Sequence, residues 1–142
     1  MRPPAISLDD LKRRLAEEFP EAFHADRGLS IVAIGHGSAE LRYMSRARSL
    51  RPGGTIGGPT MMGLADAAMY VAVLASVGWV PHAVTTNLNI NFLKKPAARP
   101  LEASCRLLKL GSRLAVGEVS IRSEGEEELA AHATATYSIP AR

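Results

Sequence analysis

Residues 60–77 read TMMGLADAAMYVAVLASV, and this stretch decides the fold of the chain. As a helix it is apolar on nearly every side, and it carries a single charge, Asp66. A helix of this kind must be covered on most of its surface, so we expect it to form the core of the domain. An ionised carboxylate among apolar side chains costs several kcal/mol unless it is compensated. Asp66 is therefore either a candidate functional residue or a residue that faces solvent or caps a backbone group.

Strand-like segments lie on both sides of this helix in the sequence. Residues 29–34 and 39–44 form a predicted hairpin around a Gly35-His36-Gly37-Ser38 turn. Four more strands are predicted at residues 84–92, 101–110, 113–123 and 129–139 because their apolar side chains recur with period two. In the third of these segments the apolar parity switches partway along, which predicts a β-bulge at Gly117-Glu118.

These elements add up to an α+β protein. Six antiparallel strands would form a curved sheet wrapped around one long central apolar helix. A short amphipathic helix should precede them, beginning at a Ser7 cap and ending before Pro20. With 142 residues, the chain fits a single domain, with an N-terminal helix and turn at 1–28 and a core at 29–142.

Composition excludes several classes of function. The net charge of +3 is carried by scattered basic residues and aromatic residues make up only 5%, so we expect no nucleic-acid partner. The apolar helix is near the minimum length for a membrane span, but Asp66, Gly78 and Pro81 favour a buried core helix and no membrane partner. A lone cysteine, Cys105, cannot form an internal disulfide, which indicates a cytoplasmic location. The four histidines show no ligand spacing with Cys105, so no metal is predicted.

Two stretches carry a resemblance to a known family. GGTIGGPTMMGLADAAM at 53–69 and AVTTNLNINFLKKPA at 83–97 resemble PaaI-type hotdog thioesterases, which hydrolyse acyl-coenzyme A thioesters. The resemblance implies a hotdog fold, Asp66 as the catalytic carboxylate, and the backbone N–H of Gly58 as the group that polarises the thioester carbonyl. It implies no cofactor beyond the coenzyme A of the substrate.

The chain departs from the family pattern at two positions. The family's HGG turn corresponds to Gly57, Gly58 and Pro59 here, so Gly57 stands where relatives carry a histidine. The oxyanion donor would survive this change because it is a backbone N–H at a helix N-terminus. Arg51 stands where many relatives carry an asparagine that helps to hold water, and an arginine cannot accept a hydrogen bond. Arg51 could bind a phosphate or an acyl carboxylate, or be a solvated loop residue.

Further candidates follow from the same resemblance. Thr85 matches a hydroxyl residue near the catalytic carboxylate, although strict alternation would turn it away from Leu88 and Ile90 unless the strand is irregular near Thr86. The remaining candidates for substrate contacts are Gly57 and Pro59 in the turn, Met62 and Met69 for an acyl group, and Lys94, Lys95 and Arg113 for coenzyme A phosphates. The methionines could equally be core fillers, and the basic residues could equally be solvated.

A length argument bears on assembly. Gly58 and Asp66 are eight residues apart, which is on the order of 12 Å along a helix. One chain can hardly bring both groups to one carbonyl, so a partner subunit should supply one of them. Hotdog relatives are homodimers or dimers of dimers with sites at the interface, which agrees. Two rival functions remain: a non-catalytic acyl-CoA binding module, and a hotdog hydratase or dehydratase.

Overall fold

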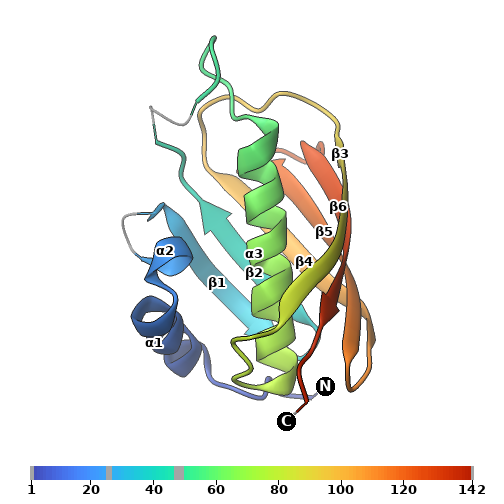
Figure 1. Cartoon of the computed structure of the whole chain (residues 1–142). Helices are drawn as coiled ribbons and strands as arrows, with labels where there is room; N and C mark the ends of the chain where they lie inside the picture. Colours follow the sequence, from blue (N-terminus) through green and yellow to red (C-terminus); the bar gives the residue numbers. More distant parts are fainter. Residues whose placement is uncertain (1, 25–26, 47–49, 142) are drawn as a thin grey trace.

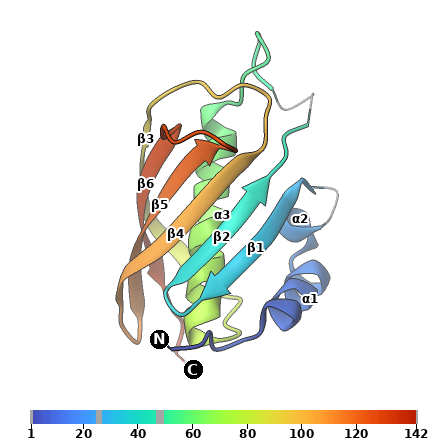
Figure 2. The ribbon, with the colours of Figure 1, turned by 180° about the vertical axis from the view of Figure 1, so that it is seen from behind.

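The computed structural model describes residues 2–24, 27–46 and 50–141. The helices are α1 (Leu8–Glu18), α2 (Pro20–Phe23) and α3 (Gly58–Val77), and the strands are β1 (Leu29–Gly35), β2 (Ser38–Tyr43), β3 (Val84–Phe92), β4 (Leu101–Leu110), β5 (Leu114–Ser123) and β6 (Ala131–Ser138). The strands form one antiparallel sheet in the order β1-β2-β4-β5-β6-β3. Figure 1 shows the sheet curving around α3, and Figure 2 shows the opposite face of the same sheet with α3 behind it.

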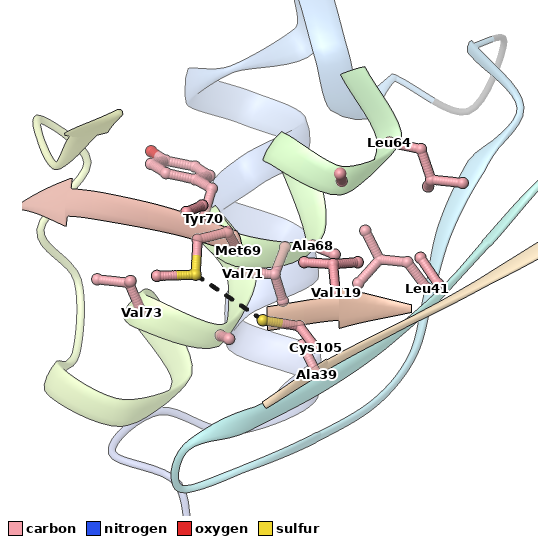
Figure 3. Packing of buried hydrophobic residues seen from close by; sticks show 14 of the residues in the cluster. Ala39, Leu41, Leu64, Ala68, Met69, Tyr70, Val71, Val73, Cys105 and Val119 are labelled. Atoms are coloured by element: carbon pink, nitrogen blue, oxygen red, sulfur yellow. Dashed lines mark hydrogen bonds between the residues drawn. The ribbon is translucent and has the colours of Figure 1, made fainter. Parts of the chain in front are cut away.

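The central helix is the core of the molecule, as its composition predicts. By length and hydropathy α3 could cross a membrane, but 67% of its most apolar window is buried inside the protein. The residues from Ala68 to Ala75 are all buried, and their neighbours are the inward side chains of β2, β4, β5 and β6. Cys105 is a small residue of this core: it is 2% exposed and its Sγ lies 3.9 Å from Met69 Sδ (Figure 3).

The predicted bulge at Gly117-Glu118 is wrong. β5 alternates regularly, and the irregularity lies on the partner strand β4, between Leu107 and Lys109. The apolar parity misled the prediction because Leu114 points outward and is 53% exposed. Packing explains the glycine at position 117 instead, because a Cβ there would lie 2.7 Å from Met69 Sδ. The glycine makes room for the methionine of the central helix.

The N-terminal segment lies beside α3 and contacts it through aromatic rings (Figure 1). Ser7 caps α1 by accepting a hydrogen bond from the Asp10 N–H at 3.1 Å, as the sequence predicts. α1 ends before Pro20, and Pro20 then begins the short helix α2, which the sequence did not reveal. Edge-on ring contacts follow, with Phe19 lying 5.8 Å from Tyr70 between ring centroids.

The two edges of the sheet differ. α1 and α2 lie beside β1, whereas β3 is the opposite edge strand, bonded on one side only to β6 (Figures 1 and 2). The β3–β6 register shifts between Thr85 and Asn87, so Thr86 is the extra residue. This shift puts Thr85 opposite Tyr137 and on the inward face, and it leaves Val84 opposite Ser138 and 56% exposed. Strict period-two alternation over residues 84–92 predicts Val84 on the same face as Leu88, and the register shift makes that prediction wrong.

Candidate active site

Two hydroxyl groups hold the Asp66 carboxylate. The Thr85 Oγ1–H donates to Asp66 Oδ1 at 2.5 Å, and the Tyr137 O–H donates to the same oxygen at 2.8 Å. The Tyr137 hydroxyl also lies 3.1 Å from the main-chain oxygen of Asp66. Asp66 itself is only half-buried. The carboxylate is thus bound by hydrogen bonds on one side and open on the other. These hydrogen bonds compensate the cost of placing a charge among apolar side chains.

Three elements bring these groups together. Asp66 lies midway along α3, Thr85 comes from the edge strand, and Tyr137 comes from the inward face of β6. The bulge at Thr86 is what turns the Thr85 hydroxyl inward toward α3. Burial and the nearby Asp66 charge both raise the pKa of Tyr137 above its ordinary value, so the phenol remains protonated and can donate.

An aromatic cavity of about 440 Å³ adjoins this carboxylate. Its wall is formed by Phe19 and Phe23 of the N-terminal helices, by Tyr70 one turn after Asp66, and by Tyr137. The rings contact one another in sequence, ending with Tyr70 and Tyr137 at 6.2 Å between centroids. The Tyr70 hydroxyl donates to the Pro81 carbonyl at 2.9 Å, which fixes the ring. The cavity offers an apolar volume beside an ionisable oxygen.

A second cavity of about 410 Å³ lies at the N-terminus of α3. Gly57 caps the helix with an extended backbone and no side-chain hydrogen bond, and Gly58 and Pro59 begin the first turn. The first N–H groups of a helix have no partner within it, so the Gly58 N–H is available as a donor to a developing negative charge. Phe92 lies directly over this glycine, because a Cβ at Gly58 would meet the Phe92 ring at 3.2 Å.

The two departures from the family pattern are in contact with each other. A Cβ at Gly57 would lie 3.0 Å from Arg51 Cδ and 3.1 Å from Arg51 Cγ. The stem of Arg51 therefore occupies space next to the position where relatives carry a histidine. A histidine at residue 57 would therefore require the Arg51 stem to shift, so the two departures are coupled through a direct contact.

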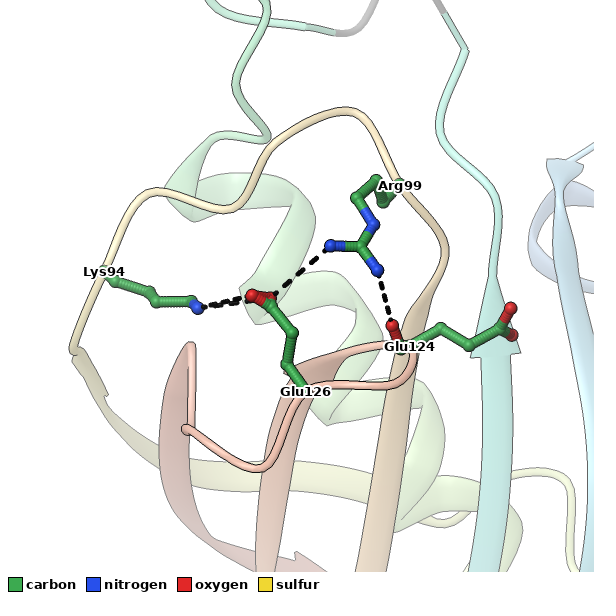
Figure 4. A network of polar contacts seen from close by, with 4 residues as sticks. All are labelled: Lys94, Arg99, Glu124 and Glu126. Atoms are coloured by element: carbon green, nitrogen blue, oxygen red, sulfur yellow. Dashed lines mark hydrogen bonds and ion pairs between the residues drawn. The ribbon is translucent and has the colours of Figure 1, made fainter.

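The candidate basic residues separate into distinct environments. Lys94 and Lys95 line the cavity at Gly58 together with Arg51. Lys94 is bound to Glu126 at 3.1 Å, and Arg99 adds a second ion pair to Glu126 at 3.8 Å (Figure 4). These partners hold the pKa of Glu126 below its ordinary value, the Lys94 hydrogen bond being the largest cause.

Three other candidates are not brought to the cavities. Arg113 donates from Nε to the Ile139 carbonyl at 3.1 Å and lines neither cavity. Met69 is fully buried against the sheet, so its geometry matches the core-filler interpretation and not the acyl-pocket one. Met62 is 40% exposed and is likewise absent from both cavity walls.

Two residues that the site needs were missed. Tyr137 and Phe92 lie in strands that the sequence predicts, at 129–139 and 84–92, but no sequence motif marks either as a site residue. Their proximity to Asp66 and Gly58 depends on the register of distant segments, since Tyr137 follows Asp66 by 71 residues. The only available signal was that Tyr137 is the single polar-tipped residue on an inward face otherwise made of alanines, leucine and isoleucine.

The architecture defines the class of protein, because one central helix wrapped by an antiparallel sheet is the hotdog fold. A proposed thioesterase from Silicibacter sp. TM1040 shares this structure with a TM-score of 0.84 and 42% sequence identity, over 96% of this chain and 94% of its own. A mutant of the phenylacetic acid degradation protein PaaI from Thermus thermophilus matches with a TM-score of 0.73 and 26% sequence identity, over 85% of this chain and 99% of its own. A proposed esterase from Saccharolobus solfataricus is 28% identical over 96% of this chain and 87% of its own.

The profile of the thioesterase superfamily matches residues 53–130, which include the helix with Asp66 and the strand with Thr85. The chain belongs to this superfamily and is a PaaI-type hotdog thioesterase.

Proposed function

We propose that this thioesterase hydrolyses acyl-coenzyme A, with Asp66 as the catalytic carboxylate and Gly58 as the oxyanion donor. The observation that carries the proposal is the hydroxyl-bound carboxylate of Asp66 on the central helix, beside an apolar cavity. Thr85 binds that carboxylate directly and joins the catalytic group.

The chemistry has two balanced routes. As a general base, Asp66 takes a proton from water while the water oxygen attacks the thioester carbon, and the proton then reaches the departing coenzyme A thiolate. As a nucleophile, Asp66 attacks the carbon, expels the thiolate and forms a mixed anhydride that water hydrolyses. In both routes negative charge develops on the carbonyl oxygen, where the Gly58 N–H would donate. Label in Asp66 after a single turnover in ¹⁸O-labelled water would identify the second route, because only a mixed anhydride that water attacks at the Asp66 carbonyl carbon leaves label in that side chain.

The site requires a second subunit. Within one chain, Gly58 lies at the Phe92 end of β3, whereas Asp66 is bonded to Thr85 at the other end. Antiparallel pairing of β3 with the β3 of a second copy would place the Phe92 end of one copy beside the Thr85 end of the other. Exposed apolar side chains lie on this strand and directly after it: Val84, Phe92 and Leu93. They support a homodimer with two composite sites, whether or not dimers pair further.

The coenzyme A phosphates would meet the basic rim of the Gly58 cavity. Lys94 is already engaged by Glu126, whereas no ion pair to Arg51 or Lys95 is found among the described residues. We therefore assign the phosphate contacts to Arg51 and Lys95, with Gly57 and Pro59 forming the turn beneath the thioester. A cytoplasmic location stays a prediction, as does the absence of a further cofactor.

The decisive experiment follows thiol release from aryl-, short- and long-chain acyl-CoAs by wild type, Asp66→Asn and Asp66→Ala. We expect both variants to lose about two orders of magnitude or more in kcat while remaining folded and dimeric. Wild type that binds an acyl-CoA without turnover, with binding unchanged in the variants, would instead favour the non-catalytic binding module.

Complementation tests the composite site. Asp66→Ala and Gly58→Pro, which removes the backbone donor, should each be nearly inactive alone. After the two variants are unfolded together and refolded, half of the dimers should be mixed, and each mixed dimer should hold one intact site. Activity should return to about a quarter of wild type for a two-fold symmetric interface. A mixture as inactive as its components would exclude a site shared between subunits.

A further inference from the structure

We propose that Tyr137 is a positioning residue that fixes the Asp66 carboxylate so that Oδ2 is the reacting oxygen. This inference rests on the proposed thioesterase function of Asp66 and adds to it a residue and an atom. Neither the family pattern in the sequence nor the superfamily match points to Tyr137, which lies beyond the matched residues 53–130.

The two oxygens of the carboxylate are in different environments. Oδ1 accepts both the Thr85 hydroxyl at 2.5 Å and the Tyr137 hydroxyl at 2.8 Å. Within residues 2–24, 27–46 and 50–141 no hydrogen bond to Oδ2 is found. An oxygen that accepts two charge-assisted hydrogen bonds is a poor base, whereas the other oxygen keeps its lone pairs for a proton or an acyl carbon.

Tyr137 is the fixed member of the pair of donors. It is 3% exposed, and it pairs with Ala115 of β5 on one side and with Thr85 of β3 on the other. Its ring also packs on Tyr70 at 6.2 Å between centroids. Thr85, in contrast, is exposed on the edge strand. The sheet interior therefore sets the position of the Tyr137 hydroxyl, and that hydroxyl sets the rotation of the Asp66 carboxylate.

Removing the hydroxyl should weaken catalysis without weakening substrate binding. In Tyr137→Phe the ring and its packing remain, but Oδ1 loses one donor and the carboxylate can rotate away from the productive orientation. We expect kcat to fall about ten- to a hundred-fold, the range expected from losing a hydrogen bond to a charged group and from misplacing a reacting atom. KM should stay within about twofold, because a side chain that is 3% exposed offers little surface to the substrate.

A matched control is available in Tyr43→Phe. Tyr43 is a half-buried tyrosine of β2 that pairs with Leu29 and Leu101, and it lines neither the Asp66 cavity nor the Gly58 cavity. This variant should keep wild-type kcat and KM. Circular dichroism and the dimer population of both variants are compared with wild type, so that a general loss of structure is recognised.

A double-mutant cycle separates positioning from a merely structural role. If Tyr137 acts through Asp66, adding Tyr137→Phe to Asp66→Ala should lower the residual activity no further. An unchanged kcat in folded Tyr137→Phe, or an equal additional loss in the Asp66→Ala background, would overturn the positioning role while leaving the proposed function in place. Wild type that hydrolyses no acyl-CoA would overturn the proposed function, and this role with it.

Discussion

Replacing Gly117 by alanine should destabilise the protein through a single contact with the central helix. The added Cβ would lie 2.7 Å from Met69 Sδ and 3.1 Å from the Arg106 carbonyl oxygen, whereas favourable carbon contacts begin near 3.5 Å. Overpacking a core in this way costs about 1–3 kcal/mol. Reduced freedom of the unfolded chain returns about 0.4–1 kcal/mol. We therefore expect a net loss of about 1–2 kcal/mol, or roughly 3–7 °C in Tm for a chain of this size.

The assay is equilibrium unfolding in urea at one fixed protein concentration. Trp79, the only tryptophan, gives a fluorescence signal, and the fixed concentration removes the effect of subunit dissociation. Gly63→Ala is the matched control because, apart from its neighbours and the backbone of its own helix, no atom of the described residues lies within 4 Å of its added Cβ. On an exposed helical position it should stabilise α3 by about 0.8–1 kcal/mol.

Met69→Ala decides whether the contact is the cause. This change alone should cost about 2–5 kcal/mol through loss of burial and formation of a cavity. Adding Gly117→Ala should then cost less, leaving the approaches at 3.1 Å to the Arg106 carbonyl oxygen and to Leu107 Cδ2, so the two changes should couple by about 1–2 kcal/mol. Gly117→Ala with wild-type stability, or with the same cost in both backgrounds, would refute the explanation of Gly117 given above.

Two further changes test the basic rim of the Gly58 cavity. Arg51→Ala should raise KM for an acyl-CoA about two- to five-fold, the effect of losing one exposed ionic contact. KM for an acyl-pantetheine, which lacks the nucleotide phosphates, should not change. An equal rise in KM for both substrates would exclude a phosphate contact. Lys94→Ala should raise the pKa of Glu126 toward its ordinary value, read by carboxyl NMR titration. The pKa of Glu126 is lower in the folded protein than in the unfolded chain. The ion pair therefore stabilises the folded protein at pH values above the ordinary pKa of a glutamate, and this stabilisation is lost as the pH falls through the lowered pKa. Wild type and Lys94→Ala should thus converge in stability in acid, and a difference that grows in acid would contradict this sign.

The sequence predicted the helix and the sheet well because each depends on local periodicity. α3 is apolar all round and each strand alternates, so burial alone specifies their types. The site was predicted only where a residue lies in a local motif, as Asp66 and Gly58 do. Tyr137 could not be linked to Asp66, because the contact depends on which strands pair and in which register. The inward orientation of Thr85 depends on a bulge at Thr86, and no glycine or proline marks that bulge in the sequence. Gly117 was misinterpreted as a bulge residue because the side chain that requires a glycine there, Met69, lies on another element.

The burial of Cys105 makes this protein convenient to label. It is the only cysteine, it is 2% exposed, and burial raises the pKa of its thiol to about 12, so at neutral pH it is neither accessible nor ionised. Reagents that report free coenzyme A should therefore see no background from the native protein. A cysteine introduced at Asn91 on the exposed edge strand would be the sole reactive thiol, and a spin label there would measure the distance between two copies without any need to remove a native residue.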